Sequence, residues 1–212
     1  MPGSNTMELG ERFNTYSHLV GAILALIGGV VLIVLGALSG DVWKVVSFSI
    51  YGATLVLLYS SSTLYHNARK GKFKIILRKL DHNSIYLLIA GSYTPFALVS
   101  LRGPWGWSLF GVVWGLALLG IFQEFWRGGK ARWVSMVIYI LMGWVALVAI
   151  QPLVKALSWA GFSWLLAGGI AYTVGILFFL YEQRLTYGHG IWHLFVLAGS
   201  ALHYFAILHY VA

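Results

Sequence analysis

The sequence predicts an all-α integral membrane protein, a bundle of seven transmembrane helices. Apolar residues make up 59% of the 212 residues and charged residues only 9%, whereas a soluble domain carries about 25% charged residues. The mean hydropathy is +0.81. Seven stretches are each long and apolar enough to cross a bilayer core of about 30 Å, which takes about 20 helical residues. Ordinary soluble enzymes, disordered proteins and collagen-like chains are therefore excluded.

The predicted spans are separated by turn residues and flanked by tryptophans. Breaks are expected at Ser39-Gly40-Asp41, Arg102-Gly103-Pro104, Gly128-Gly129 and Gln151-Pro152, because glycine, proline and small polar residues favour turns. Residues 1–17 form a short cytoplasmic N-terminal segment, and residues 18–212 form the seven-helix transmembrane domain. The first span is expected to be retained rather than cleaved as a signal peptide. The spans cover residues 18–38, 43–66, 81–100, 105–125, 133–150, 158–181 and 189–211.

The basic residues predict the orientation of the bundle. Eleven of the 14 Lys and Arg residues fall on one face of the predicted topology, which the positive-inside rule assigns to the cytoplasm. The N-terminus is then cytoplasmic and the C-terminus extracytoplasmic, in a multi-pass protein of the plasma (inner) membrane. The net charge of +8 fits contact with anionic lipid headgroups rather than nucleic acid. The basic loop at residues 70–79, which contains several apolar residues, is expected to rest on the inner leaflet.

Cysteine is absent from the sequence, which excludes a disulfide scaffold, a thiolate metal site and a cysteine nucleophile. Any metal must be bound by histidine, carboxylate or carbonyl groups. Ionisable residues are rare within the predicted spans, and those in membrane segments are functional candidates by default. What remains is a set of His, Asp and Ser residues, most of which fall at one depth, near the cytoplasmic ends of the second, third and seventh spans. This set contains Ser62, His66, Asp81, His189 and His193, and His18 lies at the same depth.

His189 and His193 form an HxxxH pair on one helical face, which suits two ligands of a tetrahedral zinc ion. His66 from another span is a natural third ligand. Three histidines with an open fourth position are typical of catalytic zinc, where the metal lowers the pKa of water to about 7. Asp81 could orient or deprotonate that water, and Ser62 could hydrogen-bond to it. The predicted site near the cytoplasmic face thus has His66, His189 and His193 as metal ligands and Asp81 and Ser62 as catalytic residues.

Each of these residues also has an ordinary structural explanation. A histidine at the edge of a span can be interfacial, Asp81 can cap a helix, and Ser62 can bond to its own helix. His203 lies too far along the seventh span to share the metal, and it either lines a cavity or bonds a neighbouring helix. Small residues within the spans favour close helix packing over ligand binding; these are Gly28, Gly29, Gly111, Gly115, Gly168, Gly169 and Gly175.

At these positions the sequence resembles the hemolysin III branch of the progestin and adipoQ receptor family, which includes the adiponectin receptors. The resemblance covers nearly the whole chain. It rests on four segments in order: Glu11-x-x-Asn14-x-x-Ser17-His18-x-x-Gly21, Ser62-Thr63-Leu64-Tyr65-His66, residues 81–96 beginning Asp81-His82, and His189-x-x-x-His193 followed by His203.

The resemblance implies a seven-helix bundle with an intracellular N-terminus. It also implies a zinc ion held by His66, His189 and His193, with Asp81 and Ser62 close to the metal. Alkaline ceramidases belong to the wider superfamily, which suggests metal-dependent hydrolysis of a lipid amide or ester. Two alternatives stay open: a non-catalytic sensor or regulator of membrane lipid with a structural zinc, and a channel or cytolysin. The expected partner is a membrane lipid substrate or ligand, and the chain is also compatible with a homo-oligomer.

Overall fold

The computed structural model describes residues 4–127, 132–185 and 187–212, and no strand occurs in these ranges. Two short turns interrupt the α-helices: the π-helical η1 (Phe96–Ser100) follows α3, and the 3₁₀-helical η2 (Val145–Ala149) separates α5 from α6. The fold is therefore all-helical over the described residues. The α-helices are α1 (Ser4–Leu38), α2 (Val42–Asn67), α3 (Lys72–Pro95), α4 (Pro104–Arg127), α5 (Arg132–Trp144), α6 (Ile150–Leu180) and α7 (Gly188–Tyr210).

Several of these helices are suited to a membrane. Among the described residues, five helical stretches are long and apolar enough to cross one. One of them, Trp133–Leu180, contains both α5 and α6, and α3 is not among the five because its first turns are rich in Lys and Arg. A multi-helix membrane protein is therefore supported, while seven crossings and their orientation stay predictions. The other four stretches are Gly10–Leu38, Val42–Asn67, Pro104–Trp126 and Gly188–Tyr210.

Several helix boundaries differ from those predicted, and α1 begins at Ser4 rather than at residue 18. Helix α3 begins at Lys72 rather than at residue 81, because a charged stretch can be helical although it lacks a membrane hydropathy signal. The break between the fifth and sixth spans falls at η2 rather than at Pro152. Pro152 instead lies in the first turn of α6, where its missing N–H leaves no helical bond unmade. The predicted break at Gly128-Gly129 and the basic residue Lys130 lie outside the described residues.

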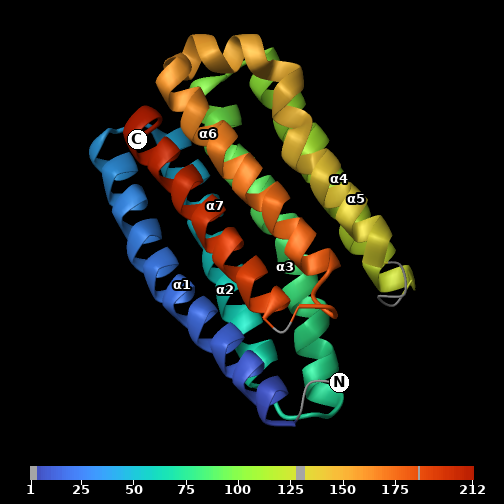
Figure 1. Cartoon of the computed structure of the whole chain (residues 1–212). Helices are drawn as coiled ribbons and strands as arrows, with labels where there is room; N and C mark the ends of the chain where they lie inside the picture. The colour runs from blue at the N-terminus through green and yellow to red at the C-terminus, as the bar shows by residue number, and fades with distance from the viewer. Residues whose placement is uncertain (1–3, 128–131, 186) are drawn as a thin grey trace.

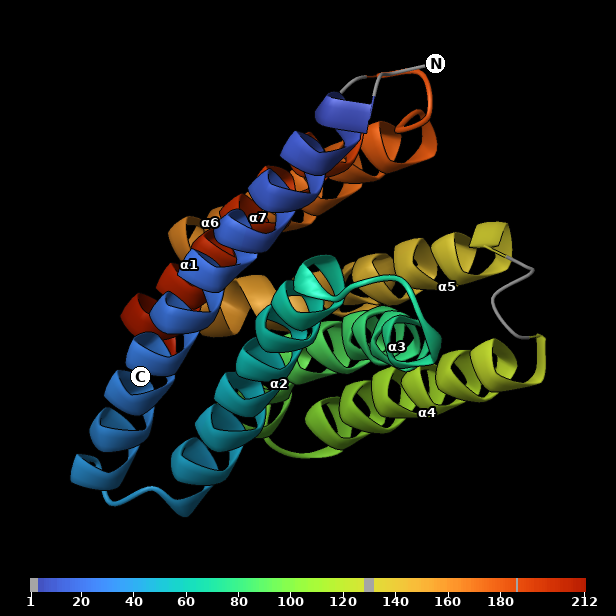
Figure 2. The same cartoon turned by 90° about the horizontal axis from the view of Figure 1, so that it is seen from below.

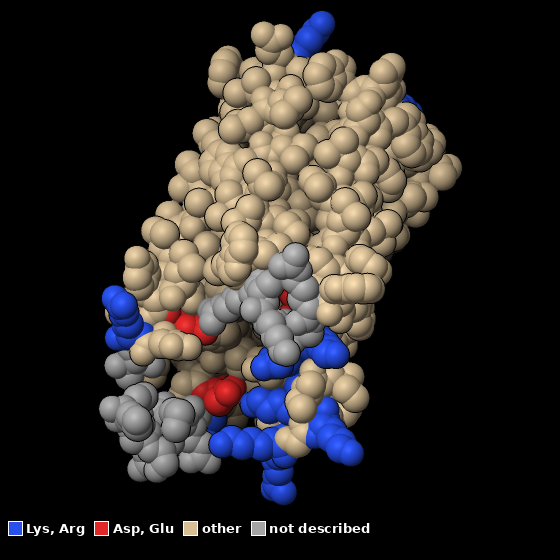
Figure 3. Space-filling view, turned by 90° about the vertical axis from the view of Figure 1, so that its right-hand side faces the viewer, with Lys and Arg blue, Asp and Glu red and all other residues tan. Residues whose placement is uncertain are grey.

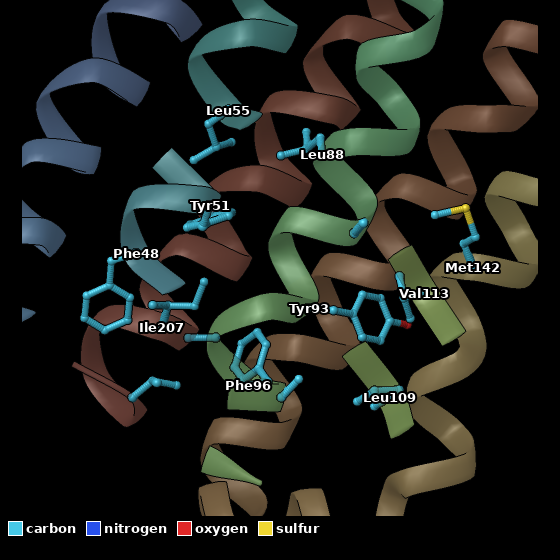
Figure 4. Packing of buried hydrophobic residues seen from close by; sticks show 14 of the residues in the cluster. Phe48, Tyr51, Leu55, Leu88, Tyr93, Phe96, Leu109, Val113, Met142 and Ile207 are labelled. Atoms are coloured by element: carbon cyan, nitrogen blue, oxygen red, sulfur yellow. The ribbon is translucent and has the colours of Figure 1, made fainter. Parts of the chain in front are cut away.

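The helices pack in two groups that meet along the bundle. Helices α1, α6 and α7 lie together, and α2 joins them to α3, α4 and α5 on the other side (Figures 1 and 2). Figure 4 shows part of the buried core, in which Tyr93, Met142 and Leu109 bring α3, α5 and α4 together. The Tyr93 hydroxyl donates to the carbonyl of Gly143 at 2.7 Å and accepts from the N–H of Ala146 at 3.1 Å. These bonds satisfy backbone groups where α5 gives way to η2.

The predicted role of the small residues is confirmed at some positions and wrong at others. A Cβ atom built on Gly52 would lie 3.2 Å from the Cα of Gly29, so α1 and α2 approach closely there. A Cβ on Gly168 would lie 2.2 Å from the His203 ring. Gly111 and Gly115, by contrast, have no described atom within 4 Å of such a Cβ, because they face away from the rest of the bundle. Their GxxxG spacing does not pack α4 against another helix of this chain.

The two ends of the bundle differ in charge. Lys and Arg side chains gather at the end where α3 and α7 begin, and the body between the two ends is largely free of them (Figures 1 and 3). At the opposite end Asp41 caps α2 and pairs with Arg102 at 2.7 Å. Desolvation acts to raise the pKa of Asp41, but hydrogen bonds from the Trp43 N–H and the Arg102 guanidinium outweigh it and hold this pKa below its usual value.

Candidate functional site: three histidines at one end of the bundle

Three imidazole rings meet where the end of α2 lies against the start of α7. His66 is in the last turn of α2, and His189 and His193 are one turn apart on the same face of α7. Their ligand atoms all lie within 4.8 Å of one another, and the Nε2 atoms of His66 and His189 are 3.2 Å apart. Two nitrogens bound to one tetrahedral zinc lie about 3.3 Å apart, as Zn–N bonds of about 2.0–2.1 Å require. The three side chains can therefore hold one metal ion.

Two carboxylates fix the orientation of two of these rings. The Nδ1–H of His66 donates to Oε2 of Glu11, on α1, at 2.7 Å. The Nδ1–H of His189 donates to Oε2 of Glu182, just after α6, at 2.6 Å. Metal-binding histidines ordinarily donate the second ring N–H to a carboxylate or carbonyl in this way, which fixes the tautomer and increases ligand basicity.

A serine orients the third ring. The Ser17 hydroxyl donates to the carbonyl of Asn14 at 3.0 Å, so its oxygen can accept from Nδ1–H of His193 at 3.4 Å. In the tautomer with the proton on Nδ1, which these partners favour, each of the three histidines keeps its Nε2 atom available to bind a metal ion. The Nε2 atom of His193 is buried without a hydrogen-bond partner.

Converging lone pairs of this kind repel one another unless a cation lies between them. A buried acceptor without a partner costs free energy, and a proton or a metal ion would remove both penalties here. Imidazole ligands with no thiolate suit zinc, copper, iron or nickel. The donor set, the spacing and the carboxylate partners therefore fit a transition-metal site.

Asp81 and Ser62 lie beside the three histidines. The Asp81 side chain is buried near the start of α3, where it accepts a hydrogen bond from the Ser62 hydroxyl and interacts electrostatically with His66 and His189. Asp81 does not belong to the group of close ligand atoms in the described chain. Its position suits a group that acts next to the metal, and its predicted catalytic role stays a prediction.

A long apolar cavity leads away from the site. It has a volume of about 130 Å³ and is lined by residues of α3, α5, α6 and α7, with His18 and Asp81 beside the histidines. On α6 its lining extends from Phe179 to Phe162, about 25 Å along the helix axis. The His18 ring stacks on that of His193, with centroids 3.6 Å apart. The lining of the cavity is mostly apolar along this length.

His82 and His203 lie away from the three metal candidates. His82 turns toward α4, with Nδ1 3.6 Å from Oε1 of Glu124, so Asp81 and not its neighbour faces the site. The Nε2–H of His203 donates to the carbonyl of Leu165 on α6 at 3.1 Å, and the ring also lines the cavity. Both expectations for His203, cavity lining and a bond to a neighbouring helix, are confirmed.

Comparison with known proteins identifies the family. The family described as haemolysin-III related matches residues 8–204. The chain is a haemolysin-III-related protein. Hemolysin-3 of Bacillus cereus is 47% identical over 201 residues, covering 95% of this chain and 91% of the relative. The Hemolysin-3 homolog of Bacillus subtilis is 44% identical over 200 residues, covering 94% and 93%. The human monocyte to macrophage differentiation factor is 29% identical over 203 residues, covering 93% and 83%.

No solved structure matches the chain. The family predicted from the sequence motifs is confirmed for this haemolysin-III-related protein. Glu182 and the orienting roles of Glu11 and Ser17 were missed by sequence reasoning. Glu182 follows the end of α6, whereas Glu11 and Ser17 lie within the first half of α1. For the two glutamates, an acidic residue near the predicted depth of the histidine cluster was the signal that could have indicated them.

Proposed function

We propose that the protein is a zinc-dependent, membrane-embedded hydrolase of a lipid amide or ester. The observation that carries this proposal is the convergence of ligand atoms from three histidines close to an apolar cavity. Zinc in such a site supplies Lewis-acid polarisation of a carbonyl and generates a nucleophile from water at neutral pH. A lipid chain in the cavity would bring its carbonyl group to the histidine end.

Residues of the chain would bind the substrate and transfer the proton. Asp81 accepts the proton of the attacking water and returns it to the leaving amine or alcohol, acting as a general base and then as an acid. Ser62 donates a hydrogen bond to Asp81 and so holds the carboxylate in position. The apolar lining from α3, α5, α6 and α7 excludes bulk water from the lipid chain, which strengthens electrostatic interactions at the reacting carbonyl.

The proposal places the protein in the plasma (inner) membrane with seven crossings and a cytoplasmic N-terminus. Helix α3 and the separate helices α5 and α6 supply the crossings beyond the stretches that qualify by hydropathy. The basic end of the bundle then faces the cytoplasm, and the metal site lies near that face.

The decisive experiment measures metal and turnover in the same samples. Purified wild-type protein is expected to contain about one zinc per chain and to hydrolyse at least one member of a panel of lipid amides and esters. His66→Ala should lose both. His209→Ala is the matched control, because His209 is exposed near the other end of α7. Equal metal content in wild type and His66→Ala, or full activity of metal-free protein, would refute the proposal.

A sensor with a structural zinc is the second candidate, because the site joins α2 and α7 and is supported from α1. Structural zinc sites are almost always closed by four protein ligands, whereas three close ligands are found in the described residues. This difference favours catalysis. A protein that binds zinc, unfolds when it is chelated and hydrolyses no lipid would favour the sensor.

A further inference from the structure

The end of the α2–α3 connection and the first turns of α3 together have a surface suited to a charged membrane. This basic segment (residues 69–80) contains six Lys and Arg residues and no Asp or Glu. All six are exposed except Lys74, which is partly buried. In Figure 3 basic side chains form a dense group at the end of the molecule where α3 begins. The other members of the set are Arg69, Lys70, Lys72, Arg78 and Lys79.

An apolar stripe runs beside these charges. Phe73, Ile76 and Leu80 are 67%, 61% and 41% exposed, and their i, i+3, i+7 spacing places them within about 60° on one face of α3. Lys72 and Lys79 lie next to each other along one side of the stripe, with stems that can lie along apolar groups while the ammonium groups stay in water. A surface that faced only water would not gain from exposing this stripe.

We propose that the basic segment binds the anionic phospholipid headgroups of the adjacent leaflet. The stripe enters the boundary between headgroups and acyl chains, and the two lysines beside it contact the phosphates, as in interfacial amphipathic helices. The charge complementarity is with a lipid surface, because nucleic acid would contact the basic groups without requiring the apolar stripe. The occupant is therefore a membrane that contains negatively charged phospholipid.

The basic segment is also connected to the three histidines. Lys74 lies 3.5 Å from Oε1 of Glu11 and 5.1 Å from the centre of the Tyr65 ring. The other oxygen of Glu11 accepts from His66. Seating of the first turns of α3 on the membrane therefore holds Lys74 against the carboxylate that orients a metal ligand. This connection between the membrane and Glu11 rests on the proposed function. It predicts that the protein binds zinc more tightly in anionic membranes than in neutral ones.

Lipid contact can be measured without reference to metal or turnover. Because the chain has no cysteine, Phe73→Cys provides one attachment point for an environment-sensitive fluorophore. In nanodiscs of phosphatidylcholine with increasing phosphatidylglycerol, quenching by brominated acyl chains is expected to rise with the anionic fraction. Lys72→Gln and Lys79→Gln should each lower the preference of the segment for anionic over neutral lipid about fivefold, since each basic residue contributes about 1 kcal/mol to binding an anionic surface. Lys155→Gln, an exposed lysine at the start of α6, is the control and should change nothing.

Equal quenching in neutral and anionic nanodiscs would overturn the proposal, as would loss of the signal on adding RNA to the anionic discs. Zinc affinity is then measured in both disc types. Tighter binding in anionic discs that disappears in Lys74→Gln supports the connection to Glu11, and equal affinity in both overturns it. If no zinc binds in either disc, the proposed function fails while the lipid result still decides whether the basic segment binds anionic headgroups.

Discussion

The carboxylate partners of the histidines allow a graded test of the metal site. Glu182→Gln and Glu11→Gln each keep the size of the side chain and remove the charge that accepts a ring N–H. Loss of such a partner lowers metal affinity by about 10–100-fold, or about 1.4–2.8 kcal/mol. Both variants should therefore bind zinc more weakly than the wild type while keeping all three ligands.

The surroundings of the two carboxylates determine which variant is affected more. The Glu182 side chain is 19% exposed and that of Glu11 is 44% exposed. The less solvated carboxylate polarises its histidine more strongly. We therefore expect Glu182→Gln to lower the zinc affinity by close to 100-fold and Glu11→Gln to lower it by close to tenfold.

Competition with a chromophoric chelator gives the zinc affinities of the detergent-purified variants. Glu124→Gln is the matched control, because Glu124 is a buried carboxylate paired with His82, away from the three close ligands. Its zinc affinity should equal that of the wild type. Affinities unchanged within about twofold in both test variants, in protein that is still folded, would show that these carboxylates do not support a metal site.

Three further predictions concern stability, measured as Tm in detergent. Gly168→Ala should destabilise the protein by about 1–3 kcal/mol through overpacking, because the added Cβ would lie 2.2 Å from the His203 ring. Gly169→Ala is the control and should leave Tm unchanged, because its Cβ would have no described atom within 4 Å. Equal Tm values for the two variants would refute the close packing at Gly168. Ser200→Ala removes the partner of two buried tyrosine hydroxyls and should cost about 1–3 kcal/mol, whereas Ser163→Ala, whose exposed hydroxyl bonds only to its own helix, should leave Tm unchanged. Zinc at about 100 times its Kd should stabilise by about 2.7 kcal/mol, and a chelator that leaves Tm unchanged would argue against metal binding to the folded state.

The histidine cluster was predictable because transmembrane topology restricts where side chains can meet. Once α2 and α7 are assigned opposite directions, the end of one and the start of the other fall at the same depth, and the HxxxH spacing places two rings on one face. Sequence alone does not show which acidic residues turn inward. Glu11 and Glu182 lie in polar stretches like those that flank any membrane helix, and only the packing of α1 and the end of α6 brings them to the rings.

The helix boundaries that differ have local causes. Hydropathy places the third span at residue 81, but the helix itself begins at Lys72, because backbone hydrogen bonding does not depend on a residue being apolar. The sequence pattern predicts a break at Pro152, although proline is equally suited to the first turn of a helix. The π-helical turn after Pro95 and the left-handed Ser158 (φ 62°) have no sequence signal of comparable strength.

The proposed ligands are synthesised at different times, so metal binding would depend on how much of the chain has been made. Helix α2 supplies a single imidazole early in translation, and α7 supplies the other two near the end. A nascent chain that has not inserted its last helix lacks two ligands and cannot form the site. Acquisition of the ion would therefore report complete insertion of the polypeptide, and prematurely terminated chains would be distinguishable by their inability to retain it.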